Sequence, residues 1–448
     1  MRLSCSSQDR PIVMSSSASP SAVPPEDARL GAGKTVVYGI QHILTMCCGI
    51  IAPPVIIGPA AHLSQVETAS LVTAALFVSG LATLLQSLGI WRVGARLPLV
   101  QGVSFTGVAT MLALLGQGSS LSVIFGAIIV SSVLGFFLAP FFAQIVRLFP
   151  PVVSGSVVTV IGLSLVPVAI GWLMGQGEHV GSVSNIGLGM FTLAAVLVIQ
   201  RCAPPSMRPL AILLGMVFGY VLALCFGKVT FISDDSAWVA LPAVFSFGMP
   251  TFEIGAIMSM VLIMVVLLAE TTAGLLAAGE VVGTTMNASR IANGLRADML
   301  SSALSPIFGS FSQSVFIQNI GLIAITGVKS RFVVAVGGAL LVVLGLLPFL
   351  GQVVASIPLP VLGGGGVLLF GTVAASGIRT LGRVDYEQNS ANLVIVATAL
   401  VMGLVPVMVP AFYGQFPEWV GVLMGSGIGT SCLVAVVLNL MFNGVPRR

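Results

Sequence analysis

The sequence predicts an all-α polytopic membrane protein with fourteen transmembrane spans, arranged as two inverted halves of seven. Hydrophobic residues make up 56% of the 448 residues and charged residues only 7%, with a mean hydropathy of +1.09. Soluble domains carry about 25% charged residues, so this chain could not cover the surface of a soluble fold. Its apolar stretches recur from end to end, and a helix needs about 20 residues to cross the hydrocarbon core of a bilayer.

Fourteen apolar stretches follow one another along the chain. We expect spans at residues 37–58, 68–91, 98–116, 121–140, 152–174, 185–201, 209–227, 256–279, 294–308, 317–328, 332–351, 358–378, 391–412 and 417–442. We expect the segment before them, residues 1–32, to be a disordered cytoplasmic tail, because it is rich in Ser and Pro and lacks an apolar core.

Charged residues separate these spans in a pattern that supports their number. Cytoplasmic loops are enriched in Lys and Arg. All basic residues except Lys228 fall in the terminal segments or in alternate loops, on one predicted side: Arg2, Arg10, Arg29, Lys34, Arg92, Arg96, Arg147, Arg201, Arg208, Arg290, Arg296, Lys329, Arg331, Arg379, Arg383, Arg447 and Arg448. The other loops hold acids: Glu67, Glu178, Asp234, Asp235, Glu253 and Glu418. Both termini are therefore expected on the cytoplasmic side of the cell membrane, and the net charge of +4 indicates orientation rather than nucleic-acid binding.

The sequence lacks the patterns of an enzyme, a metal centre or an ATP-driven pump. Its three histidines and six cysteines show no metal-ligand spacing. The stretch 31–35 resembles the end of a phosphate-binding loop, but Ala28 occupies the position of the leading glycine and no strand precedes it. We expect no metal, no cofactor and no catalytic residue.

Seven spans per half place the second half upside down relative to the first. Transporters built this way bind substrate where corresponding spans of the two halves are broken. Spans 3 and 10 correspond, and their openings at residues 97–107 and 309–317 are polar and rich in Gly. Each opening is predicted to be a short extended segment that leads into a half helix, whose N-terminus points at a ligand in mid-membrane.

Three polar residues stand where a bilayer would demand apolar ones. Gln318 and Asn319 lie in span 10, and Glu270 lies well inside span 8. An unpaired polar group in hydrocarbon costs several kcal/mol, so such residues face a protein interior or a watery cavity and mark a ligand or ion path. Glu270 must be protonated, paired or exposed to a cavity; the alternative role is a permanently protonated acid at a helix kink.

These residues carry a family resemblance. Four motifs together resemble the nucleobase-ascorbate transporter family, also called nucleobase cation symporter family 2. They are Gln41-His42 in span 1, the sequence 101–105 in span 3, Glu270-Thr-Thr in span 8, and Gln318-Asn319-x-Gly321 with Thr326 in span 10. The resemblance implies a core domain formed by residues 33–145 and 251–353, and a gate domain formed by residues 146–250 and 354–448. It also implies an elevator-like movement and a homodimer.

The resemblance implies roles for individual residues as well. Glu270 and Gln318 would bind the nucleobase, with Phe105, Ser104 and Ile317 beside them and Asn319 in support. Proton coupling or support of the site would fall to Glu270, His42, Asp298, Gln41 and Thr326. Asp298 stands twenty residues before Gln318; its alternative role is a loop acid that balances Arg296, and His42 could equally be a packed helix partner.

The function implied is import of xanthine or uric acid by proton symport. A neutral amide at position 318 resembles the xanthine and uric acid carriers, because it can both donate to and accept from an oxidised purine edge; a carboxylate there would suit uracil. Two departures bear on the exact purine: Gly274 replaces an acid that many purine carriers have, and Ile320 replaces a second Asn. A uracil permease, a nucleobase channel and a fourteen-span anion exchanger remain alternatives, and so does sodium coupling.

Overall fold

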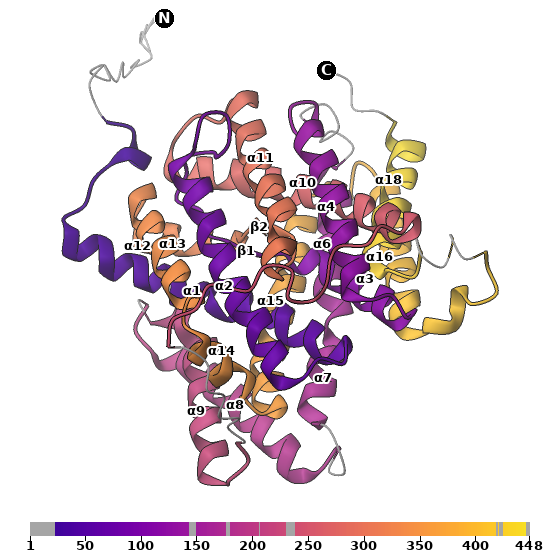
Figure 1. The fold of residues 1–448 in the computed structure, drawn as a ribbon. Coiled ribbons are helices and arrows are strands. Elements are labelled where there is room, and N and C mark those ends of the chain that lie inside the picture. Colours follow the sequence, from indigo (N-terminus) through magenta and orange to yellow (C-terminus); the bar gives the residue numbers. More distant parts are fainter. Residues whose placement is uncertain are drawn as a thin grey trace, which may run out of the picture.

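The computed structural model shows a helical protein built around one short ribbon of two strands (Figure 1). It describes residues 23–142, 149–175, 180–205, 207–229, 238–417, 420 and 424–444. Some charged residues for which a side of the membrane was expected lie outside the described ranges: Arg2, Arg10, Arg147, Glu178, Asp234, Asp235, Glu418, Arg447 and Arg448.

The first half of the chain supplies one strand and eight α-helices within the described residues. Its elements are η1 (Pro25–Asp27), α1 (Ala32–Ala60), α2 (Gln65–Leu88), β1 (Gln101–Val103), α3 (Phe105–Gly116), α4 (Leu121–Leu138), α6 (Pro151–Ser164), α7 (Val166–Met174), α8 (Val183–Cys202), η4 (Arg208–Leu210) and α9 (Ala211–Cys225).

The second half repeats this order. Its elements are α10 (Ile254–Val282), α11 (Ala288–Leu304), η5 (Ser305–Phe308), β2 (Gln313–Val315), α12 (Ile317–Thr326), α13 (Arg331–Gly345), α14 (Pro348–Ala355), α15 (Leu359–Leu381), α16 (Ala391–Met408), η6 (Pro410–Tyr413) and α18 (Gly427–Asn443). α1 and α10, which open the two halves, each contain 29 residues.

Local sequence explains several helix boundaries. Ser64 and Glu67 form a capping box at the start of α2, each side chain accepting a hydrogen bond from the other residue's backbone N–H. α10 ends at Gly283, whose φ of 81° favours glycine. The expected span at 332–351 is bent by 81° between α13 and α14; Pro348 begins α14, and its missing N–H prevents one continuous helix there.

Nine helices in the described part of the chain are long and apolar enough to cross a membrane, or ten if α13 and α14 count as one broken span. A helix also occupies each of the four other expected positions, namely α3, α11, α12 and α18, but these contain only 10 to 17 residues. The chain is therefore an integral membrane protein.

The extended segments expected in spans 3 and 10 are confirmed. β1 and β2 pair antiparallel, with Gln101 opposite Val315 and Val103 opposite Gln313. α3 and α12 follow the strands after one residue each, so two half helices start from opposite ends of one ribbon near the middle of the fold (Figure 1).

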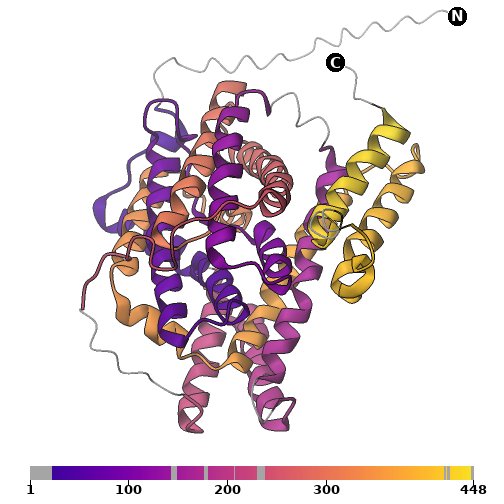
Figure 2. The ribbon, with the colours of Figure 1, turned by 45° about the vertical axis from the view of Figure 1, so that its right-hand side comes forward.

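The remaining helices pack in two groups around this ribbon. α1, α2, α4, α10, α11 and α13 pack on one another, while α6, α15, α16 and α18 form a second set together with α7, α8 and α9. Figure 2 shows α16 and α18, in yellow, at one side of the molecule, next to the magenta helices of the first half. The ribbon and both half helices pack with the first group, and α6 and α18 of the second group contact α3.

Arginines from several expected cytoplasmic loops gather on one face. Arg290 Nη2 forms an ion pair with Glu26 at 2.8 Å and donates to the carbonyl of Arg96 at 3.0 Å. Arg331 forms an ion pair with Asp27 at 2.5 Å. The last part of the tail, residues 23–32, therefore differs from the disorder expected for it, because two acids tie it to α11 and α13; residues 1–22 lie outside the described part.

Candidate binding site

A cavity of about 40 Å³ lies where both half helices begin. Ser104 and Phe105 line it from the start of α3, and Ile317 and Gln318 line it from the start of α12. Glu270 on α10, together with Ser314 and Ser376, supplies the other polar groups of its wall. The N-termini of two helices point their positive dipole ends at this space, an arrangement that favours electron-rich or anionic groups.

Glu270 faces this cavity and receives a hydrogen bond from a threonine. The hydroxyl of Thr106, in the first turn of α3, donates to Glu270 Oε2 at 2.6 Å, and Thr106 is almost completely buried. The two ion pairs found among the described residues involve Glu26 and Asp27 instead. Of the arrangements expected for Glu270, the structure shows exposure to a cavity.

Gln318 and Asn319 point in different directions from the start of α12. Gln318 is exposed and lines both this small cavity and a further cavity of about 610 Å³, so its amide is accessible to a ligand. Asn319 is fully buried and donates through Nδ2 to the carbonyl of Pro98 at 2.8 Å. Asn319 thus ties α12 to the segment that leads into β1 and lies behind the cavity wall.

His42 on α1 is the second partner of Asn319. Because Asn319 Nδ2 faces Pro98, its Oδ1 faces His42 Nδ1 at 2.5 Å. A carbonyl oxygen only accepts, so Nδ1 carries the proton and donates it. His42 Nε2 is buried without a hydrogen-bond partner among the described residues. His42 is therefore a buried residue of α1 whose side chain holds the Asn319 amide in place.

Asp298 on α11 is fully buried and collects hydrogen bonds from three elements. Gln101 in β1 donates to Oδ1 at 2.6 Å, and Thr271, the residue after Glu270, donates to Oδ2 at 2.5 Å. Gln86 Nε2 lies 3.5 Å from Oδ1. The alternative that Asp298 is a loop acid balancing Arg296 is wrong, because Asp298 is inside the protein.

Phe105 forms the aromatic side of the cavity. Its ring stacks on Phe316 with centroids 6.5 Å apart and meets Phe370 of α15 edge to face at 5.9 Å. Gly102 makes this possible, since a Cβ there would come within 2.3 Å of the Phe316 ring. Ser104 caps α3 by accepting from the backbone N–H of Thr106 at 3.2 Å.

Two of the expected site residues lie elsewhere. Thr326 ends α12, where its hydroxyl donates to the carbonyl of Leu322 and accepts from Val328 N–H, so it terminates the helix. Gln41 is next to His42 on α1, but it is absent from the lining of the cavity. The structure therefore brings together Glu270, Gln318, Phe105, Ser104 and Ile317, and places His42, Asn319 and Asp298 behind them.

A second cavity leads from this site toward the arginine-rich face. It measures about 340 Å³ and shares Glu270 and Ile317 with the small cavity. Further out, Glu280 of α10 and Arg379 and Arg383 of α15 line it. Glu280 is exposed, as expected for a charge near a helix end. The site is therefore next to a wider opening on one side, whose lining is largely apolar near the site and carries charged residues further out.

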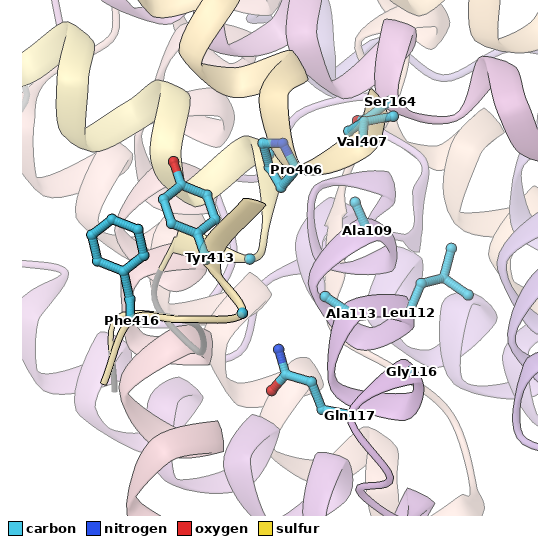
Figure 3. A pocket seen from close by; sticks show the side chains of 13 residues that line it. Ala109, Leu112, Ala113, Gly116, Gln117, Ser164, Pro406, Val407, Tyr413 and Phe416 are labelled. Atoms are coloured by element: carbon cyan, nitrogen blue, oxygen red, sulfur yellow. The ribbon is translucent and has the colours of Figure 1, made fainter. Parts of the chain in front are cut away.

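A larger chamber of about 670 Å³ lies along the other part of α3 (Figure 3). Figure 3 shows Ala109 and Leu112 on one wall and Tyr413 and Phe416 on the other. Residue 109 is one helical turn beyond Phe105, so the chamber and the site share one face of α3. The buried hydroxyls of Thr110 on α3 and Ser426, the N-cap of α18, are hydrogen-bonded at 2.6 Å beside it.

Sequence reasoning did not assign roles to Thr106, Thr271 or Gln313. Thr271 directly follows Glu270, and a hydroxyl next to an acid in an apolar stretch is the signal that could have identified it; Thr106 follows Phe105 and meets Glu270 only in the fold. Gln313 stands in the polar opening of span 10, as Gln101 does in span 3. Among the described residues, no group of three or more His, Cys, Asp or Glu could hold a metal ion.

Sequence comparisons match residues 33–412 to the model of the Permease family of xanthine and uric acid permeases. The uric acid transporter UacT of Escherichia coli K12 is 38% identical over 427 residues, which cover 94% of this chain and 89% of that protein. The xanthine permease of Bacillus subtilis strain 168 is 37% identical over 418 residues, covering 93% and 95%. The uric acid permease PucK of Bacillus subtilis strain 168 is 37% identical over 413 residues, covering 91% and 95%.

Solved structures share the fold at much lower sequence identity. The transmembrane domain of the cyanobacterial bicarbonate transporter BicA has a TM-score of 0.59 and 14% identity, covering 91% of this chain and 98% of that one. SLC26A9 gives a TM-score of 0.61 with 12% identity, covering 92% and 66%.

Proposed function

We propose that this chain, which belongs to the permease family that its sequence matches, is a secondary active transporter that imports xanthine or uric acid by proton symport. The family match confirms the resemblance that the motifs indicated. The observation that carries the proposal is the shared cavity: an acid, Glu270, and an amide, Gln318, lie beside the Phe105 ring at the start of both half helices.

Recognition follows from the chemistry of these groups. An oxidised purine presents neighbouring N–H and C=O groups, and the Gln318 amide can accept from one and donate to the other. Glu270 accepts a further N–H, and Phe105 covers the ring face. A purine lacking these groups would leave buried partners unpaired, at about 1–3 kcal/mol each. The relatives named for uric acid and xanthine support this substrate class.

Fourteen spans in a seven-plus-seven inverted repeat form part of the proposal. The two halves repeat the order of two helices, a strand and a half helix, and both begin with a helix of 29 residues. The two packing groups support a core domain of residues 33–145 and 251–353 and a gate domain of residues 146–250 and 354–448. The arginine-rich face is then cytoplasmic, with both termini on it.

The cavity of about 340 Å³ and the chamber of about 670 Å³ support an inward-facing state of an elevator-type carrier. The cavity beside Glu280, Arg379 and Arg383 opens from the site toward the arginine-rich face. On the opposite side, a hydrogen bond between Thr110 of the core and Ser426 of the gate holds the two proposed domains together beside the chamber. Cysteines introduced at these two positions, in a protein with Cys202 and Cys225 replaced by serine, should form a disulfide that stops uptake until it is reduced.

Glu270 is the proposed proton carrier, because it is an acid that faces the substrate cavity. The test is uptake of labelled xanthine, uric acid and uracil into cells that express the chain, with and without a protonophore and with sodium varied. Accumulation of xanthine or uric acid that the protonophore abolishes is expected, and Glu270→Gln should prevent accumulation. Uphill uptake by that variant would contradict the coupling role of Glu270.

The same assay separates the alternatives. Accumulation of uracil alone would keep the family and overturn the role of Gln318 in selectivity. A channel would equilibrate a nucleobase without concentrating it. The fold shared with BicA concerns architecture only; exchange of labelled bicarbonate without nucleobase uptake would favour an anion exchanger. A homodimer is also proposed, and the mass of the purified protein in detergent, measured by light scattering, tests it.

A further inference from the structure

Each strand of the central ribbon begins with a glutamine whose backbone is held by a hydroxyl from the helix before it. Thr83 on α2 accepts from the N–H of Gln101 at 2.9 Å and donates to its carbonyl at 3.4 Å. Ser302 on α11 accepts from the N–H of Gln313 at 2.8 Å and donates to its carbonyl at 3.2 Å. The four residues are fully buried. Each strand is thus attached to its own half of the chain in the same way.

The side chains of these glutamines cross to the helix of the other half. Gln101 Nε2 donates to Asp298 on α11 at 2.6 Å. Gln313 Oε1 accepts from Ser79 on α2 at 3.0 Å. Asp298 stands four residues before Ser302 on α11, and Ser79 stands four residues before Thr83 on α2. The contacts are therefore related by a pseudo-twofold axis through the ribbon, with an acid on one side and a serine on the other.

The geometry points to Gln313 as a positioning residue for substrate recognition, held in place by Ser302 and Ser79. In this arrangement Gln313 sets where α12 begins, as Gln101 does for α3. The inference rests on the proposed function, because it assigns Gln313 the task of placing the substrate-binding amide of Gln318.

The route from Gln313 to the cavity is short and rigid. Only Phe316 separates β2 from α12, and Gln318 is the second residue of that helix. The Phe316 ring is packed on Gly102 so closely that even a Cβ would not fit. Phe316 therefore cannot absorb a displacement of the strand, and a shift at Gln313 moves Gln318 relative to Glu270.

The chain offers a matched pair of variants for the test. Ser301 and Ser302 are neighbours on α11 and both are buried. Ser302 holds Gln313, whereas the hydroxyl of Ser301 donates only within its own helix, to the carbonyls of Ala297 and Asp298. Uptake of the purine that the wild-type protein accumulates is measured for Ser302→Ala, Ser301→Ala and Ser302→Thr in cells, with surface expression and thermal unfolding recorded for each.

Ser302→Ala removes both hydrogen bonds to the Gln313 backbone; we expect it to raise KM about five- to tenfold, with kcat changed less than about twofold. It should also reduce discrimination against purines that lack the neighbouring N–H and C=O groups with which the Gln318 amide pairs. Ser301→Ala should leave KM and selectivity unchanged, and Ser302→Thr should restore both. A purely structural role would lower thermal stability while KM and selectivity stay at the wild-type values.

A second pair of variants tests the cross-contact. Gln313→Ala should raise KM more than Ser302→Ala, and adding Ser79→Ala to it should cause no further loss, since their shared bond is already gone. Equal KM values for Ser302→Ala and Ser301→Ala would overturn the inference while the proposed function stands. If Ser302→Ala does not reach the membrane, Ser79→Ala replaces it, and a wild-type KM in that variant would be the overturning result. A wild-type protein that transports no nucleobase would overturn both.

Discussion

Replacing Thr106 by valine removes a single hydroxyl from beside Glu270 and preserves the shape of the side chain. The Thr106 hydroxyl donates to Glu270 Oε2 at 2.6 Å, inside a part of α3 that is otherwise packed. A hydrogen bond to a charged group contributes about 1.5–3 kcal/mol, and one between neutral groups about 0.5–1.5 kcal/mol. Each 1.4 kcal/mol corresponds to a factor of about ten.

The expected loss in kcat/KM for uptake is therefore roughly ten- to a hundredfold if Glu270 binds the nucleobase as a carboxylate, and about two- to tenfold if it is neutral. Thr106→Ser keeps the hydroxyl and should retain most of the activity. Thr272→Val is the matched control: Thr272 is also buried near Glu270, but its hydroxyl donates to the carbonyl of Leu268 in its own helix.

Initial rates of labelled xanthine or uric acid uptake, normalised to the amount of protein at the cell surface, provide the measurement. Activity of Thr106→Val equal to that of Thr272→Val would refute the reasoning, because it would mean that the orientation of Glu270 does not depend on this bond. A loss in both variants with lowered surface expression would show that the losses come from folding.

Three further predictions follow from single residues. Gln318→Glu should move preference from oxidised purines toward uracil in competition assays, and unchanged selectivity would contradict the pairing of its amide with the purine edge. Gly274→Ala should keep uptake and raise the unfolding temperature by a few degrees, because the added Cβ meets Val315 at an ordinary 3.5 Å and alanine favours helices. Gly102→Ala should abolish uptake, because its Cβ would displace the Phe316 ring. Equal uptake by the two variants would contradict this packing argument. Burial raises the pKa of Glu26, but hydrogen bonds and the charge of Arg290 outweigh this effect and hold the pKa below the ordinary 4.5. The contact between Glu26 and Arg290 therefore stabilises the N-terminal segment above pH 4.5 and is lost as the pH falls through the lowered pKa. Hydrogen exchange of residues 25–32 should accordingly become faster in acid for the wild type, and Glu26→Gln should show no such change with pH.

Much of the fold was predictable because its signals are local. The expected span 121–140 compares with α4 at Leu121–Leu138, and the expected span 185–201 with α8 at Val183–Cys202. Apolar length decides such helices, since every backbone group in hydrocarbon must be paired within its own segment. The bend between α13 and α14 was missed because a proline at a helix start and one inside a helix look alike in a hydrophobic stretch.

The site was predictable in its residue types but not in its contacts. The sequence by itself determined that Glu270 and Gln318 stand within apolar stretches and that spans 3 and 10 open with extended segments, because each follows from composition or spacing along the chain. The tertiary structure decided that His42 supports Asn319, that Thr326 only ends α12, and that Asp298 and Ser79 reach strands from opposite halves. The hydrogen bonds of His42, Ser79 and Asp298 to Asn319, Gln313 and Gln101 join residues more than 190 positions apart, and no local pattern encodes which distant partner a side chain meets when the two halves fold together.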